Sequence, residues 1–132
     1  SQMMDSLKDL RLEEKAAFLA DRHKIAAAES YLRRALEALF DIGRHILAKR
    51  FAYPATEYKE IAKGLSENKV LVEKEGELMR KMAGYRNRMV HFYHEITPEE
   101  LHEICLYHLN EIKLLADKLA QWTKEYQNSA TN

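Results

Sequence analysis

Arg86 and His91, near the middle of the chain, are the two residues whose types and spacing are best suited to chemistry. A histidine titrates near neutral pH, so it can accept or release a proton during a reaction. An arginine stays charged and presents a planar set of N–H donors that matches the oxygens of a phosphate. RNA supplies its own nucleophile, the 2′-hydroxyl, so an acid–base group and a cation suffice without a metal ion. The pair is therefore suited to phosphodiester cleavage in RNA.

The residues around this pair form two neighbouring lines if the segment is a helix. One line contains Met79, Ala83, Arg86, Val90 and Tyr93, and the other contains Arg80, Gly84, Asn87, His91 and His94. The first line is apolar except for its arginine, which indicates a cleft or an interface because arginine is rarely buried without a partner. The second line is polar, and its glycine leaves space. Lys81 and Arg88 add positive charge at the edge of this side, so we predict that they bind or orient the substrate.

The spacing of the pair raises a geometric difficulty. Arg86 and His91 lie five residues apart, which is about 140° around an ideal helix, so they do not share a face. The long arginine side chain could wrap around the helix, the helix could distort near its end, or a second chain could complete the site. We favour the third arrangement, which predicts a homodimer.

The elements that must position these residues are predicted to be helices. Only four glycines and two prolines interrupt the chain, so its fold class is expected to be all-α. Hydrophobic periodicity predicts helices over residues 5–19, 21–50, 57–65, 73–92 and 97–126. The last one begins with a capping box, in which Thr97 is the N-cap, Pro98 is the first helical residue and Glu100 closes the box. These helices predict an up-and-down bundle of four to five helices.

The predicted helix over residues 21–50 has two apolar lines. One contains Ile25, Ala28, Leu32, Ala35, Leu39, Ile42 and Ile46, and the other contains Leu36, Phe40, Gly43 and Leu47. A helix that is apolar on two sides is either central to a bundle or shared with a partner chain. Because two lines exceed what a small bundle is expected to cover, we predict a dimer interface along this helix.

Composition limits the classes of protein that the chain can represent. Its 132 residues fit a single domain, expected over residues 3–127, with residues 1–2 as a cloning remnant and 128–132 as a polar tail. The 21 basic and 21 acidic residues exclude a broad positive field, and hence a non-specific nucleic-acid coat. The lone cysteine, Cys105, allows no internal disulfide and is expected to be a buried hydrophobe in a cytoplasmic protein. No apolar run is long enough to span a membrane, so no membrane partner is expected.

Two groups of residues have spacings found in metal sites, and neither is expected to bind a metal. Glu99 and His102 have the spacing of one half of a di-iron site, but the second half is missing. A zinc cluster of His91, His94 and Glu95 is better explained by the arginine–histidine motif, so no metal or other cofactor is expected.

Four other polar residues lie outside the arginine–histidine pair and merit separate predictions. His108 lies on an apolar line and is predicted to belong to the core. Glu37 and Asp41, one turn apart, could pair with Arg86 or form a solvated helix face, and both alternatives stay open. The role of His94 is also left open.

The motif Arg86-x4-His91-x-Tyr93, with Asn87 directly after the arginine, resembles the R-x4-H-x-Y motif of the HepT branch of the HEPN ribonucleases. The similarity extends to two segments: residues 36–43, which resemble the second helix of the family, and residues 82–91, which resemble the fourth. The resemblance implies an endoribonuclease toxin of a type VII-like toxin–antitoxin pair. It implies a homodimer with both motifs facing one cleft, and cleavage that leaves a 2′,3′-cyclic phosphate and a 5′-hydroxyl. It also implies a cognate antitoxin, a minimal nucleotidyltransferase that attaches AMP to the motif tyrosine.

On this resemblance, each motif position receives a role. His91 is the acid–base catalyst, Arg86 holds the scissile phosphate, Asn87 orients one of them, and Tyr93 is the hydroxyl that receives AMP. The alternative is a non-catalytic HEPN module that binds a nucleotide or a partner nucleotidyltransferase. The intact arginine–histidine pair favours the enzyme, because a binding module needs no acid–base group.

Overall fold

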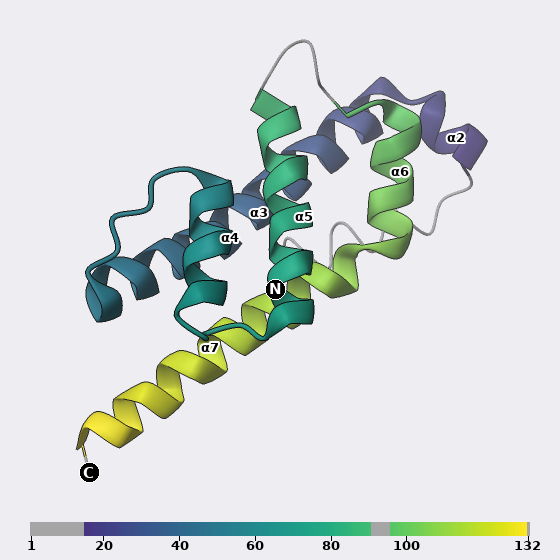
Figure 1. The fold of residues 1–132 in the computed structure, drawn as a ribbon. Coiled ribbons are helices and arrows are strands. Elements are labelled where there is room, and N and C mark those ends of the chain that lie inside the picture. The colour runs from purple at the N-terminus through teal and green to yellow at the C-terminus, as the bar shows by residue number, and fades with distance from the viewer. Residues whose placement is uncertain (1–14, 91–95, 132) are drawn as a thin grey trace.

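The computed structural model describes residues 15–90 and 96–131 of the chain. Within these residues it forms six α-helices and no strand, which confirms the all-α fold class (Figure 1). The helices are α2 (Lys15–Leu19), α3 (Arg22–Phe51), α4 (Tyr58–Glu67), α5 (Glu73–Val90), α6 (Pro98–Tyr107) and α7 (Leu109–Thr131). Four of the predicted helices match observed ones over their described residues, and the fifth is divided into α6 and α7.

Local side chains determine where the long helix α3 begins, and its end is formed by the backbone. The Asp21 carboxylate accepts hydrogen bonds from the backbone N–H groups of His23 (3.0 Å) and Lys24 (3.2 Å), which satisfies donors that have no intrahelical partner. At the other end Ala52 adopts a left-handed conformation (φ 49°), and its N–H donates to the Leu47 carbonyl. The helix therefore ends at Phe51, three residues before Pro54.

α3 is the central helix of the bundle, and it contacts α2, α4, α5, α6 and α7 (Figure 1). The residues of its two apolar lines are buried within this one chain, with two exceptions: Ile25 is half-buried and Ile42 is 36% exposed. The prediction that this helix needs a partner chain to cover it is therefore wrong. The bundle covers both lines because α4 and α5 pack on one side of α3 while α6 and α7 pack elsewhere along it.

Two glycines allow α4 to approach α3 closely. A Cβ atom at Gly43 would lie 3.0 Å from the side chains of both Ile61 and Leu65, and one at Gly64 would lie 2.9 Å from those of Leu47 and Tyr53. A larger residue at either position would force these neighbouring side chains to shift. This close packing fixes the position of the first turn of α4, which contributes to the candidate site.

The start of α6 follows the prediction. Thr97 is the N-cap, its hydroxyl accepts a hydrogen bond from the backbone N–H of Glu100 (3.2 Å), and Pro98 is the first helical residue. The prediction of one continuous helix from there to residue 126 is wrong, because α6 ends at Tyr107 and α7 begins at Leu109. The break lets α6 pack on α2 and α3 while α7 follows a different path along α3 and α5.

His108 occupies the break between α6 and α7, and its predicted place in the core is wrong. Its side chain is 26% exposed, and its Nδ1 atom lies 2.8 Å from Glu111 Oε1 and 3.2 Å from Lys81 Nζ. The apolar period of the sequence passes through this position although the backbone turns there. His108 therefore belongs to a polar cluster where α6 and α7 meet α5.

Three smaller predictions concern Cys105, the C-terminal tail and membrane insertion. Cys105 is buried, as predicted, and burial raises the pKa of its thiol to about 12. α7 continues to Thr131, so most of the segment predicted as a polar tail is helical. Among the described residues, no helix is both long and apolar enough to cross a membrane.

Candidate functional site

The candidate site lies where α5 packs against α3 and α4. α5 contributes Arg86 and Asn87, α4 contributes Tyr58 from its first turn, and α3 contributes Glu37. The sequence places Arg86 on the apolar line of α5, and its neighbours on that line, Met79 and Ala83, are fully buried. Arg86 is consequently carried into the interior and is only 9% exposed. This confirms the prediction that its line faces the protein and not solvent.

Arg86 has few partners for so buried a cation. Its Nη2 atom lies 3.6 Å from Glu37 Oε1, and its guanidinium carbon lies 5.2 Å from the centre of the Tyr58 ring. Its Nε and Nη1 atoms are buried and have no hydrogen-bond partner among the described residues. Burying a charged donor without a partner is costly unless another interaction compensates. These two donors are therefore available to an anionic ligand.

Of Glu37 and Asp41, the two residues of α3 considered as partners, only one pairs with this arginine. Glu37 does so, and its side chain remains 41% exposed. Asp41 instead pairs with Arg44 at 2.8 Å on the exposed side of α3. A partner that is itself partly solvated holds the guanidinium weakly, because water screens the attraction. A phosphate can therefore replace Glu37 as the partner of Arg86.

Asn87, the residue next to Arg86, lines a hollow of about 340 Å³ at the start of α4. Thr56, Glu57 and Tyr58 form the rest of its lining. The Tyr58 ring is braced by an edge-on contact with the buried ring of Phe40, with 5.1 Å between ring centres. The sequence did not identify Thr56, Glu57 and Tyr58 as site residues. Their only signal was an aromatic residue at the start of a predicted helix, which is too common to identify a site.

The polar line of α5 is open where Gly84 lies. A Cβ atom built at Gly84 would meet no atom within 4 Å, and Arg80, one turn earlier, is exposed. The prediction that this glycine leaves space is confirmed for the described part of the chain. Among the described residues, this face of α5 is therefore open beside Gly84.

Arg88 and Lys81 contact different helices from Arg86. Arg88 donates two hydrogen bonds to the Glu100 carboxylate of α6, at 2.7 Å and 2.5 Å, and Lys81 Nζ lies 3.2 Å from Glu111 of α7. The pairing raises the pKa of the Arg88 guanidinium and lowers that of the Glu100 carboxyl. The structure therefore does not bring these two cations together with Arg86.

Tyr85 lies between these two ion pairs. Burial raises the pKa of its phenol, and the positive charge of Lys81 opposes the shift. Its ring centre lies 6.3 Å from that of His108. On the side of α5 that faces α6 and α7, Lys81 and Arg88 are thus each already paired with a carboxylate.

His91, Tyr93, His94 and Glu95 lie outside the described residues. The bidentate pair between Arg88 and Glu100 nevertheless joins the last turn of α5 to the first turn of α6. The two ends of the segment that carries the remaining motif residues are therefore held by a direct link.

The metal hypotheses concern two groups of residues. Among residues 15–90 and 96–131, no three His, Cys, Asp or Glu side chains are grouped so that they could hold a metal ion. His102 is buried, and its ring centre lies 5.1 Å from that of Phe18. The hypothetical zinc ligands His91, His94 and Glu95 lie outside this part of the chain.

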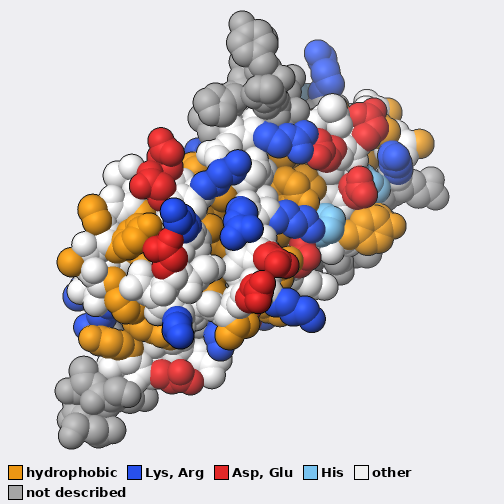
Figure 2. Space-filling view, in the orientation of Figure 1, with side chains coloured by type: hydrophobic (Ala, Val, Ile, Leu, Met, Phe, Trp, Pro, Cys, Tyr) orange, Lys and Arg blue, Asp and Glu red, His pale blue; other side chains and the backbone are white. Residues whose placement is uncertain are grey.

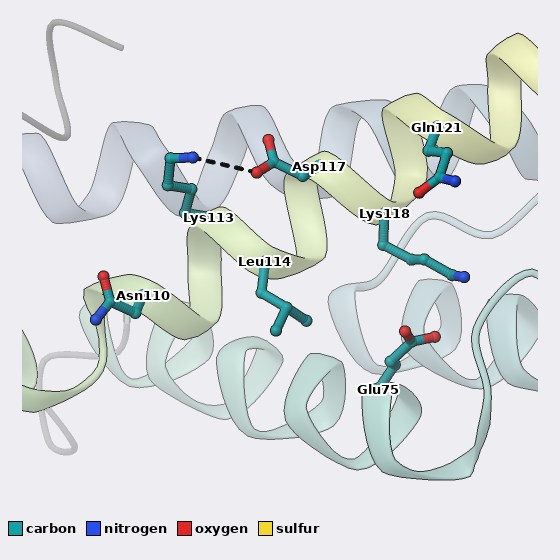
Figure 3. Close-up of a pocket in the computed structure, with 7 residues that line it drawn as sticks. All are labelled: Glu75, Asn110, Lys113, Leu114, Asp117, Lys118 and Gln121. Atoms are coloured by element: carbon teal, nitrogen blue, oxygen red, sulfur yellow. Dashed lines mark hydrogen bonds and ion pairs between the residues drawn. The ribbon is translucent and has the colours of Figure 1, made fainter.

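A second hollow in the described part of the chain lies away from the arginine site. A hollow of about 480 Å³ lies between α5 and α7, and Figure 3 shows Glu75 from the start of α5 facing Leu114 and Lys118 of α7. It contains no motif residue, and along α5 it is about 16 Å from Arg86. On the face seen in Figure 2, basic and acidic side chains are interspersed, in keeping with the equal numbers of charges in the sequence.

These features define an all-helical protein with a nearly buried arginine in an R-x4-H motif. The sequence model of the family described as "Ribonuclease HepT-like" matches residues 1–119. The chain therefore belongs to the HepT-like ribonuclease family. No curated protein sequence matches the chain.

Two solved structures share the fold. One is a tri-AMPylated HEPN toxin from Shewanella oneidensis in complex with an MNT antitoxin, with a TM-score of 0.80 and 20% identity over 91% of this chain and 90% of that one. The other is described as a toxin–antitoxin with AMP-PNP, with a TM-score of 0.77 and 19% identity over 89% of each chain. At these identities the similarity establishes the fold alone.

Proposed function

We propose that the chain is a metal-independent RNA endonuclease, the toxin of a type VII-like toxin–antitoxin pair, and that it acts as a homodimer. The observation that carries the proposal is the state of Arg86. It belongs to the family motif, it is only 9% exposed, and two of its donors have no hydrogen-bond partner among the described residues. A protein gains little stability from such a group, so a ligand that is anionic and bidentate accounts for it best.

In the proposed reaction, Arg86 donates two hydrogen bonds to the non-bridging oxygens of the scissile phosphate and stabilises the charge that develops there. His91 removes the proton from the 2′-hydroxyl, and the oxygen attacks the phosphorus. The bond from phosphorus to the 5′-oxygen breaks, and that oxygen takes up a proton. The products are a 2′,3′-cyclic phosphate and a 5′-hydroxyl. Two motifs at one dimer cleft provide a base and an acid together.

Asn87 is the proposed substrate-orienting residue, because it adjoins both Arg86 and the hollow at the start of α4. Arg88 and Lys81 were expected to share this task. Each is already paired with a carboxylate, so each must exchange its partner before it can bind RNA. Their proposed contribution is therefore secondary to that of Asn87.

The dimer is proposed on the family resemblance and on the open face at Gly84, because α3 is covered within its own chain. Static light scattering on the purified chain at micromolar concentration should give twice the mass of one chain. A monomeric mass would contradict the shared cleft.

The nuclease is tested by cleavage of RNA in the presence of EDTA. Wild-type activity should survive EDTA, whereas His91→Ala and Arg86→Ala should each lose about 10²–10⁴-fold while staying folded by circular dichroism. A His91→Ala variant that cleaves at the wild-type rate would show that His91 is not the catalyst. Activity that EDTA abolishes and zinc restores would establish a metalloenzyme instead. A non-catalytic module would cleave RNA in none of these samples.

We further propose that a cognate nucleotidyltransferase silences the nuclease by attaching AMP to Tyr93. The Shewanella oneidensis toxin of the same fold is AMPylated and bound to an MNT antitoxin, which supports this control. The added phosphate would pair with Arg86, and the adenine would occupy space needed by RNA. Co-expression followed by peptide mass spectrometry should find AMP on Tyr93, and Tyr93→Phe should stay active. AMP on Tyr85 instead would overturn the assignment.

A further inference from the structure

The hollow at the start of α4 adjoins the phosphate-binding arginine, and Thr56, Glu57 and Tyr58 in its lining have no role in the proposed cleavage reaction. It measures about 340 Å³ and is lined by Thr56, Glu57, Tyr58 and Asn87. This volume is at the lower end of the range for small-molecule sites, which fits a single base and not a larger ligand. The function of such a pocket beside a scissile phosphate depends on the chemistry of its walls.

One wall is aromatic and rigid. The Tyr58 ring is half-buried and braced edge-on by Phe40, so it keeps its orientation without a ligand. The guanidinium of Arg86 lies 5.2 Å from the centre of the same ring. A single nucleotide can therefore place its phosphate on Arg86 and its base against Tyr58. Packing of a base on an aromatic side chain is a common source of affinity for single-stranded RNA and depends little on base identity.

The other walls are polar, and they can discriminate between bases. Glu57 occupies the N-cap position of α4, yet its side chain makes no capping hydrogen bond, and the residue is exposed. Its carboxylate therefore keeps its acceptor capacity for a ligand. Asn87 offers both an amide donor and a carbonyl acceptor, and Thr56 offers a hydroxyl.

A carboxylate is matched best by two parallel N–H donors. The Watson–Crick edge of guanine presents such a pair, from N1 and the 2-amino group. Uracil presents a single N–H between two carbonyl oxygens, and those oxygens would face the lone pairs of the carboxylate. A pocket with Glu57 in its lining therefore favours guanine and rejects uracil.

We infer that the hollow formed by Thr56, Glu57, Tyr58 and Asn87 is a nucleobase subsite that selects guanine beside the phosphate held by Arg86. The inference rests on the proposed function, because it assigns the specificity of the same site. Tyr58 supplies an unselective aromatic contact, and Glu57 supplies the selectivity.

The test is calorimetric titration of the full chain with guanosine, inosine and uridine 3′-monophosphates. A bidentate contact to a base changes affinity by roughly 5-fold to 100-fold, so guanosine should bind more tightly than uridine by that factor. Inosine, which lacks the 2-amino group, should fall between them. Glu57→Gln should bring the three affinities to within about 2-fold of one another, because the amide replaces one acceptor with a donor.

Matched variants separate the subsite from general effects. Glu60→Gln removes an exposed carboxylate from the same helix, outside the hollow, and should leave the guanosine preference intact. Tyr58→Leu should weaken all three nucleotides alike, whereas Tyr58→Phe should retain the ring and the affinity. Equal binding of guanosine and uridine by the wild type, or a preference that survives Glu57→Gln, would overturn the inference.

A cleavage assay separates this inference from the proposed function. Oligonucleotides of uridine that carry one guanosine should be cut next to it, and the same oligonucleotides with inosine should be cut more slowly. If the wild type cuts RNA without regard to guanosine, the subsite is wrong and the nuclease stands. If it cuts no RNA, the nuclease is wrong, and the titrations still decide whether the hollow selects guanine.

Discussion

The pair formed by Arg88 and Glu100 is expected to hold the motif segment in place, and the perturbation that tests it is Glu100→Gln. The two hydrogen bonds, 2.7 Å and 2.5 Å long, join the last turn of α5 to the first turn of α6. Between these turns lies the segment that contains His91 and Tyr93. Glutamine keeps the size of the side chain but removes the charge and one of the two acceptors.

The magnitude of the effect follows from exposure and geometry. The side chains of Arg88 and Glu100 are 38% and 32% exposed, so solvent screens their attraction. Exposed pairs contribute about 0.2–1 kcal/mol, and the bidentate geometry places this pair near about 1 kcal/mol. A chain of 132 residues unfolds with an entropy of about 0.28 kcal/mol/K, so Tm should fall by about 3–4 °C.

The pH dependence supplies an independent check. The pKa of the Glu100 carboxyl is lowered in the folded protein, chiefly by its hydrogen bonds from Arg88. A lowered carboxyl pKa stabilises the fold above the ordinary value of 4.5, and this stabilisation is lost as the pH falls through the lowered value. The difference in Tm between wild type and Glu100→Gln should therefore be complete at neutral pH and should shrink below pH 4.5.

The assay is thermal unfolding by circular dichroism, with RNA cleavage measured on the same samples. Glu99→Gln is the matched control, because Glu99 is an exposed residue of the same helical turn, where either carboxylate interacts with the helix dipole. Glu100→Gln should also slow cleavage, by roughly 10-fold, because the link between the two ends of the segment that carries His91, the proposed catalyst, is weakened. Equal Tm values for the two variants, or a difference that persists at acidic pH, would refute the reasoning.

Three further predictions concern single residues. Gly64→Ala should destabilise the fold by about 1–2 kcal/mol in urea unfolding, because the added Cβ would lie too close to Leu47 and Tyr53. Gly84→Ala should instead stabilise one chain by up to about 1 kcal/mol, because alanine favours a helix more than glycine does. The same change should weaken any dimer that closes at Gly84, as measured by sedimentation. Glu37→Gln should lower the free energy of unfolding by about 1 kcal/mol. It should also lower KM for RNA, because it removes the carboxylate that competes with the phosphate for Arg86. A raised KM would contradict that role. Cys105 should resist iodoacetamide in the native protein at neutral pH and react only on unfolding, because burial raises its pKa to about 12.

The helices were predictable because their signals are local. The Asp21 cap and the Thr97 capping box mark helix starts through contacts within three residues. The apolar periods of α3 and α5 identify their buried faces, and the position of Arg86 on one of them predicts that it is buried. A pattern of this kind depends only on the order of residues in one helix.

The break at His108 was not predictable from the same signals. The apolar period runs through it unchanged, and the residues on either side, Tyr107 and Leu109, do not disfavour a helix. The chain turns there because α6 and α7 pack against different partners. The free energy lost by breaking the helix is offset by the side chains that α6 and α7 bury against their different neighbours. A pattern within one helix cannot reveal these contacts between helices.

The sequence by itself therefore determined the helical class, most helix boundaries and the identity of the motif, since all of these depend on neighbouring residues. Only the tertiary structure decided that the central helix α3 is covered by its own chain, which removed one argument for a dimer. It also decided that Arg86 meets Glu37 and Tyr58, while Arg88 meets Glu100. Two arginines two residues apart point to opposite sides of one helix, and what they meet depends on which helices pack there.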